Sequence, residues 1–181
     1  KYIGVILDEE MKFEVHVNSI IKSLVKYFGI FNHLKDTISA KLARTLYFAF
    51  IHPRIKFGIE IYGACSSCLL AKLQTVQNKL LKLLLRQHPR TSTNAIHHEQ
   101  RILKIADLYR LSLSLLVYDC IHQNCPAIFK NSFIVKNTPH LTRQAGQLHI
   151  QRARTNMGSS RAQYHAAEIW NNLSRNVKSA Y

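Results

Sequence analysis

The chain has 181 residues and 47% of them are hydrophobic, so it can bury a core and wholesale disorder is excluded. Lys and Arg number 25 against 10 acidic residues, and the formal net charge of +15 indicates a polyanionic partner, most often nucleic acid. The longest run without a charged residue, residues 61–71, is far shorter than the ~20 residues of a membrane-spanning helix. The first residues show no signal-peptide pattern, and we expect the chain to be a piece of a longer protein.

The first half of the chain is predicted to form a short strand and then helices. Residues 1–13 combine a β-rich segment with a turn-like acidic triplet, which is typical of a β-strand or hairpin. Residues 14–33 carry apolar side chains at helical spacing. Ser39 is a predicted N-cap for the next helix, which is expected to end near Pro53.

The second half is predicted to contain two longer helices and an irregular basic tail. Leucines at helical spacing indicate an amphipathic helix from Leu69 that ends before Pro89, and another helix is expected between Asp107 and Pro126. Residues 130–163 are polar and show no sustained period, as expected of an extended arm. A short helix over residues 166–173 is expected to dock this arm through Trp170.

Together these elements predict a mostly α fold. It would be a small helical bundle with a short N-terminal β-strand or hairpin and an extended basic C-terminal arm. The predicted divisions are residues 1–13, 14–129 and 130–181. Eight apolar side chains on the helices are expected to be buried: Leu24, Phe28, Leu46, Phe50, Leu73, Val76, Leu80 and Leu83.

The excess of positive charge grows along the chain. Residues 1–60 carry nine basic and six acidic side chains, residues 61–120 eight and three, and residues 121–181 eight and one. No acidic residue stands between Glu60 and Glu99. An ordinary solvated surface mixes both signs, so a surface that lacks one sign favours contact with phosphates.

One row of side chains carries much of this charge. Lys72, Thr75, Lys79, Lys82 and Arg86 are spaced i, i+3, i+7, i+10 and i+14. On one helix they would form a ridge ~21 Å long, opposite the leucines. A weaker row consists of Lys22, Lys26 and His33. The alternative interpretation is that these cations only keep leucine-rich helices in solution.

The tail contributes arginines rather than lysines. Arg143, Arg152, Arg154 and Arg161 are candidate phosphate-binding residues, because a guanidinium can bind two phosphate oxygens at once. A solvated loop is the alternative.

The sequence contains little that predicts catalysis or a metal centre. Cys65 and Cys68 form a C-x2-C pair, but the second pair, Cys120 and Cys125, has an unusual spacing, so reduced thiols are favoured over zinc or a disulfide. His97 and His98 are interpreted as a surface pair. We predict no catalytic residue, metal or cofactor within this chain.

Several stretches resemble the reverse transcriptases of LINE-type, Jockey-like non-LTR retrotransposons. Residues 1–8 resemble the strand that follows the catalytic palm, and residues 52–63 resemble a thumb motif of a proline followed by two aromatic-Gly pairs. The tail resembles the arm that closes these polyproteins at the following positions: Thr142, Arg143, Gln144, Arg152, Arg154, Thr155, Gly158, Ser160, Tyr164, Ile169, Trp170, Asn171 and Leu173.

The resemblance implies a polymerase thumb and C-terminal arm that hold an RNA/DNA template–primer duplex by its backbone. It also implies an intracellular protein of nucleus and cytoplasm, palm aspartates located before Lys1, and the palm and fingers as protein partners. Neither a membrane nor a small-molecule substrate is expected.

Two other functions stay open. A helical protein-interaction module would dock its leucine faces on the missing palm or on another partner. Membrane-surface binding through the basic, leucine-rich region around residues 80–85 is the third interpretation.

Overall fold

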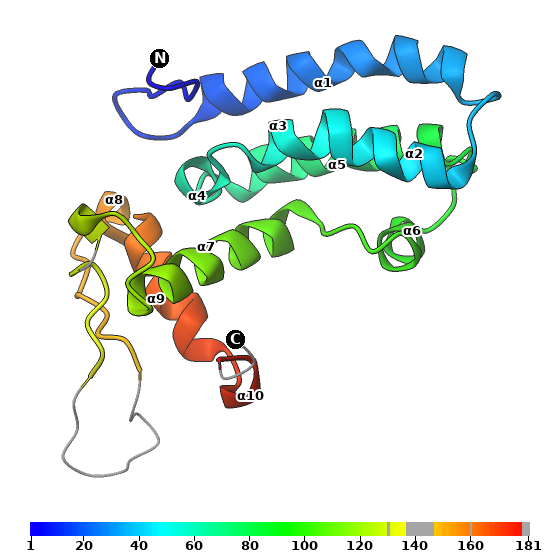
Figure 1. Ribbon diagram of the computed structural model, residues 1–181. Helices are drawn as coiled ribbons and strands as arrows, with labels where there is room; N and C mark the ends of the chain where they lie inside the picture. The colour runs from blue at the N-terminus through cyan, green and yellow to red at the C-terminus, as the bar shows by residue number, and fades with distance from the viewer. Residues whose placement is uncertain (130, 137–146, 160, 179–181) are drawn as a thin grey trace. The chain divides into compact units, whose positions relative to one another are not determined.

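The structure is a computed structural model and describes residues 1–129, 131–136, 147–159 and 161–178. Within these ranges the regular elements are helices, and β-structure is limited to two isolated bridges (Figure 1). The mostly α prediction is therefore confirmed. The chain divides into two compact units, Lys1–Leu108 and Tyr109–Tyr181, and the boundary lies inside one helix. No helix in the described ranges is long and apolar enough to cross a membrane.

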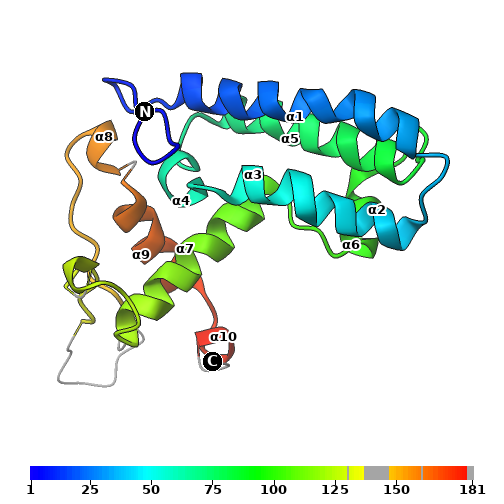
Figure 2. The same ribbon diagram turned by 45° about the horizontal axis from the view of Figure 1, so that its top comes forward.

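The first unit is built from helices that pack around a leucine- and isoleucine-rich core. Its elements are α1 (Glu14–Leu34), α2 (Ala40–Leu46), the π-helix η1 (Tyr47–Ile51), α3 (His52–Lys56), α4 (Ile59–Tyr62), α5 (Ser67–Leu84), α6 (Thr93–Glu99) and the first turn of α7 (Ile105–Ile121). The two long helices, α1 and α5, lie side by side (Figures 1 and 2). Ser39 caps α2 as predicted, because its hydroxyl accepts a hydrogen bond from the Leu42 N–H.

The N-terminal segment is a tight turn followed by irregular backbone, so a strand over residues 1–13 is not confirmed. Tyr2 and Val5 exchange two backbone hydrogen bonds around Ile3 and Gly4, both of which have positive φ. Positive φ at both central residues is the geometry of a two-residue hairpin turn.

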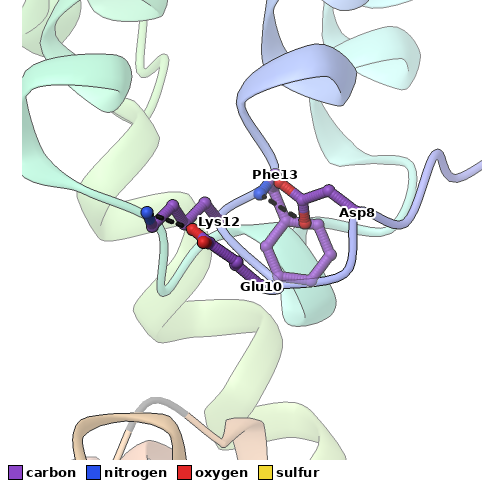
Figure 3. Close-up of polar contacts among 4 residues, drawn as sticks. All are labelled: Asp8, Glu10, Lys12 and Phe13. Atoms are coloured by element: carbon purple, nitrogen blue, oxygen red, sulfur yellow. Dashed lines mark hydrogen bonds and ion pairs between the residues drawn. The ribbon is translucent and has the colours of Figure 1, made fainter.

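The backbone after this turn is organised by side chains (Figure 3). The Asp8 carboxylate accepts a hydrogen bond of 3.2 Å from the Phe13 N–H, and Lys12 pairs with Glu10. Phe13 itself adopts the left-handed conformation, with φ of 58°, and α1 begins at the next residue. These local contacts take the place of the backbone hydrogen bonds to a neighbouring strand that a β-strand would need.

Two glycines join the N-terminal turn to the junction between α3 and α4. A Cβ at Gly4 would lie 2.8 Å from the Phe57 ring, and a Cβ at Gly58 would lie 2.9 Å from the Val5 side chain. Gly58 also has φ of +69°, which favours glycine. The two segments that resemble the palm–thumb strand and the thumb motif therefore pack directly on each other.

The helix predicted to end near Pro53 continues past it, which corrects the prediction. Pro53 has no N–H to bond the carbonyl four residues earlier, and its ring would clash with that carbonyl. The preceding segment winds as a π-helix instead, in which the His52 N–H bonds to the Tyr47 carbonyl five residues away. The wider turn accommodates the proline without ending the helix.

The π-helix also changes which side chains are buried. Tyr47 and Ile51 face the core, whereas Phe50 is 43% exposed and Leu46 is only half-buried. The prediction for Phe50 was wrong because it assumed an α-helical period throughout. Leu24, Leu73 and Leu80 are buried as predicted, and the side chains of Phe28, Val76 and Leu83 are half-buried.

The second unit contains the rest of α7 and the tail. Its elements are η2 (Ala127–Phe129), a bridge between Val135 and Leu148, α8 (Asn156–Ser159), α9 (Ala162–Asn172) and α10 (Arg175–Lys178). Trp170 is buried within this unit. Beside it, the Asn171 amide accepts a hydrogen bond from the Leu148 N–H at 2.8 Å and donates one to the Leu148 carbonyl at 3.0 Å. This pairing holds the strand-like segment against α9.

Candidate nucleic-acid interface

The outer face of α5 carries part of the predicted basic row. Lys72, Thr75 and Lys79 are exposed, and the buried leucines of α5 occupy the opposite side of the helix. The Thr75 hydroxyl donates to the Ala71 carbonyl at 2.8 Å and so leaves the row open to solvent. Among the described residues, neither lysine has a carboxylate within ion-pair distance.

The other two cations of the row bind the protein's own backbone. Lys82 is half-buried and its ammonium donates to the Pro89 carbonyl. Arg86 lies beyond the end of α5 with φ of 52°, and its guanidinium donates to the Lys35 carbonyl and, at 3.2 Å, to the Ile38 carbonyl. The single ridge predicted to include Arg86 is therefore shorter. The exposed part runs from Lys72 to Lys79, or ~11 Å.

The weaker row lies on the outer face of α1. Lys22, Lys26 and His33 are exposed, opposite the buried side chains of this helix. Val15, Val25 and Ile30 are also exposed on α1. The outer face of α1 is consequently a mixed surface, whereas the row on α5 is polar and basic.

The arginines of the tail gather around one cavity in the second unit. Arg152, Arg154 and Arg161 all line a cavity of about 280 Å³. His149 and Tyr164 line it as well and were not singled out as binding residues from the sequence, although Tyr164 is part of the resemblance described above. Arg143 lies outside the described residues.

His97 is not a surface residue, which corrects the interpretation of His97 and His98 as a surface pair. His97 is only 6% exposed, while His98 is exposed. The Nδ1 of His97 donates to the Ile102 carbonyl at 2.9 Å, and the Nε2 of His97 lies 2.9 Å from Asn78 Oδ1. Burial lowers the pKa of His97 from its usual 6.5, and the bond to the Ile102 carbonyl opposes this shift.

Three amide side chains of α5 extend this buried network. The Gln77 amide donates to the Tyr47 hydroxyl at 2.7 Å and to the Leu103 carbonyl at 3.1 Å. The Gln74 amide donates to Gln77 Oε1 at 2.7 Å and to Asn78 Oδ1 at 2.8 Å, and its oxygen accepts from the Ile105 N–H at 2.9 Å. The network fixes the loop after α6 and the first turn of α7, so its role is structural.

The cysteines do not form a metal centre within the described residues. No group of three or more His, Cys, Asp or Glu side chains in these ranges is arranged to hold a metal ion. Burial raises the pKa of Cys65 to about 11, so its thiol is protonated at neutral pH and is a weak nucleophile. The absence of a metal and a cofactor remains a prediction.

Comparisons with known proteins identify one class of relative. No family model matches the chain, and no solved structure matches it. The probable RNA-directed DNA polymerase from transposon X-element of Drosophila melanogaster is 27% identical over 112 residues, which are 59% of this chain and 12% of that protein. The RNA-directed DNA polymerase from mobile element jockey of Drosophila funebris is 26% identical over 113 residues, 61% of this chain and 12% of that protein.

Both relatives are RNA-directed DNA polymerases, so this is the class of protein to which the chain is similar. More narrowly, both relatives come from mobile elements of the non-LTR type, so the matches support a relationship of this chain to LINE-type reverse transcriptases. The chain spans only about 12% of the length of these curated relatives.

Proposed function

We propose that this chain is the thumb and C-terminal segment of an RNA-directed DNA polymerase of a non-LTR retrotransposon. In this role it binds the RNA/DNA template–primer duplex without sequence preference and catalyses no reaction by itself. The similarity to the X-element and jockey polymerases supports the class. The helical first unit and its basic surface support duplex binding as the specific role.

The observation that carries the proposal is the exposed row on α5. Lys72 and Lys79 stand about two helical turns apart on a straight, well-packed helix, with no carboxylate beside them among the described residues. An A-form duplex presents two rows of phosphates along a wide, shallow groove. A straight row of cations can follow such a backbone and makes no contact that depends on the base sequence.

The test is a titration of the purified chain with a labelled RNA–DNA duplex at several salt concentrations. Replacing Lys72 and Lys79 by Ala should weaken binding equally on every duplex sequence. It should also reduce the slope of log affinity against log salt by ~1–2 units, because each neutralised phosphate releases about 0.9 counterions. Both lysines lie on the exposed face, so α5 should remain folded.

A matched control removes the same charge elsewhere. Lys41 on α2 and Lys56 on α3 are exposed and lie outside the row. The Lys41→Ala/Lys56→Ala variant should bind nearly as well as the original chain. Equal losses in both double variants would mean that net charge alone attracts the duplex, and duplex binding by the row would be refuted.

A second candidate function is supported by apolar exposure at the N-terminus. Tyr2 and Ile3 are 68% and 76% exposed at the tip of the first turn, and Leu7 and Met11 are also exposed. These side chains fit a helical module that docks on the palm of the polymerase. In that case Tyr2→Ser with Ile3→Ser should weaken association with a separately produced palm and leave duplex affinity unchanged.

A further inference from the structure

The arginine-lined cavity of the second unit has features that the helical row lacks. It is concave, and its walls come from three parts of the tail: residues 131–134, residues 149–155 and the region of α8 and α9. Its volume of about 280 Å³ is close to the lower limit for pockets that hold small organic ligands. The cavity therefore admits one small group and excludes a stacked duplex.

The charge around the cavity is of one sign. The guanidinium groups of Arg152, Arg154 and Arg161 have no hydrogen-bond or ion-pair partner among the described residues. No acidic side chain lines the cavity. The nearest acid in the sequence, Glu168, lies 3.9 Å from His165 instead. All three arginines are exposed, so their guanidiniums are accessible to an anion, and their paired donors fit the oxygens of a phosphate.

Two parts of the backbone bring the three arginines to this cavity. Arg152 and Arg154 stand two positions apart on a segment without helical structure. Arg161 precedes the first residue of α9, and its side chain does not cap that helix. The free N–H groups of the first turn of α9 add partial positive charge close to Arg161.

The cavity also has an apolar wall. Tyr164 and Phe133 line it with half-buried aromatic rings, and Ile134 adds an exposed aliphatic side chain. Aromatic faces bind unstacked bases of any sequence, whereas bases inside a duplex are stacked and inaccessible. Phosphate-binding arginines beside an aromatic wall are the combination that one unpaired nucleotide requires.

The turn from Thr155 to Gly158, which forms part of the cavity wall, is tightly packed. The Thr155 hydroxyl accepts a hydrogen bond of 3.0 Å from the Gly158 N–H. A Cβ at Gly158 would lie 3.2 Å from this hydroxyl and 3.4 Å from the Ala153 side chain. Thr155, Gly158 and Ala153 all line the cavity, so glycine allows the segment of Arg152 and Arg154 to fold closely against α8.

We propose that this cavity binds one unpaired nucleotide, with its phosphate between Arg152, Arg154 and Arg161 and its base against Tyr164 and Phe133. The site lies in the second unit and does not depend on the row of α5. It adds recognition of a single-stranded segment, or of a free nucleotide, to the duplex binding proposed above.

The test uses three probes with the full chain: a labelled single-stranded pentanucleotide, AMP and inorganic phosphate. Arg152→Ala/Arg154→Ala should weaken pentanucleotide binding by about tenfold or more, because two charge-assisted contacts are lost. Its affinity for the RNA–DNA duplex should change by less than about threefold. Lys72→Ala/Lys79→Ala should have the reverse pattern, so failure of the cavity and failure of the row are distinguishable.

Two further variants define the chemistry. Tyr164→Ala should weaken pentanucleotide binding but leave phosphate binding unchanged, and Tyr164→Phe should retain both. Arg152→Lys/Arg154→Lys keeps the charge and loses the paired donors, so it should give an intermediate loss. The fluorescence of Trp170, the single tryptophan of the chain, reports whether the second unit remains folded.

The outcomes distinguish binding of a free nucleotide from binding of a single strand, and two of them would overturn the proposal. Competition by AMP, lost in the arginine variant, supports a free nucleotide. Binding of the pentanucleotide without competition by AMP supports a single strand. The proposal is overturned if folded arginine variants bind the pentanucleotide as well as the Lys41→Ala/Lys56→Ala control does, or if no probe binds.

Discussion

The two units present their cations in different ways. In the first unit, Lys72 and Lys79 project from a regular helix whose opposite side is fixed in the core. In the second unit, Arg152, Arg154 and Arg161 come from irregular backbone and a helix start, and they surround a hollow. A row on a helix suits a long, regular polyanion, and a concave cluster suits one anionic group. Under the two proposals above, similar charge in one chain serves two kinds of contact.

The same contrast applies to the neutral polar groups. The first unit buries a network of amide side chains around Gln77 and His97. Gln77 donates to the Tyr47 hydroxyl and the Leu103 carbonyl, and His97 donates to the Ile102 carbonyl, so these donors are already used within the protein. In the second unit, the pairing of Asn171 with Leu148 holds the segment that leads into the cavity. In both units, neutral side chains fix the backbone. Lys82 and Arg86 also bind backbone carbonyls, whereas Lys72 and Lys79 remain exposed.

The largest expected effect concerns the core behind the α5 row. Leu73 is fully buried, and Leu73→Ala should destabilise the first unit by ~3 kcal/mol through lost burial and the cavity that remains. Its exposed neighbour provides the control: Lys72→Ala should change the free energy of unfolding by less than about 0.5 kcal/mol. Amide hydrogen exchange of α1 and α5 measures both. Similar values for the two variants would contradict the separation of a core face from a binding face.

A smaller effect is expected at the junction of the N-terminal turn and α4. Gly58→Ala places a Cβ in a left-handed conformation and against Val5, so it should cost ~1–2 kcal/mol. Gly29→Ala on α1 is the matched control, because nothing lies within 4 Å of the new Cβ and alanine favours a helix. Thermal melting followed by circular dichroism compares them. An unchanged melting temperature for Gly58→Ala would refute the close packing of the two segments.

A smaller effect on the stability of the first unit is expected from a change in pH. Burial lowers the pKa values of His16, His52 and His97 below 6.5, so these imidazoles take up protons at a lower pH in the folded first unit than in the unfolded chain. The unfolded chain binds more protons as pH falls below about 6.5, so stability is complete above that pH and decreases below it. Melting temperatures at pH 7.5 and 5.5, repeated in high salt to screen the net charge, measure the effect. Equal melting temperatures at both pH values would contradict it.

Local sequence patterns predicted the regular helices well. The expected helix over residues 14–33 is α1, and the leucine period from Leu69 is α5. Ser39 was identified as an N-cap because a short hydroxyl before an apolar period has a defined hydrogen-bonding role. These features depend on residues within one or two turns of each other, which a sequence displays directly.

Features that depend on distant residues were not predicted. His97 is buried because Asn78 on another helix and the Ile102 carbonyl surround it, and no local pattern indicates this. Arg86 was assigned to a helical row, but its partners are carbonyls about fifty positions earlier in the chain. The arginines of the tail were identified individually, and the cavity that joins them requires the folded backbone.

The π-helix has a consequence for the number of residues in this part of the chain. Ala43, Tyr47, Ile51, Ile55 and Ile59 recur every four residues and are all nearly inaccessible to solvent. In a continuous α-helix, each step of four residues would rotate by about 40°, so the side chains from Ala43 to Ile55 would turn by ~120° and leave the core. Ile59 already belongs to α4, after the break at Gly58. The wider turn at Tyr47–Ile51 compensates for part of this rotation. The segment therefore holds one residue more than an α-helix would. Deletion of Ala49 would leave Tyr47 and Ile55 seven positions apart, a spacing that an ordinary α-helix also places on one face.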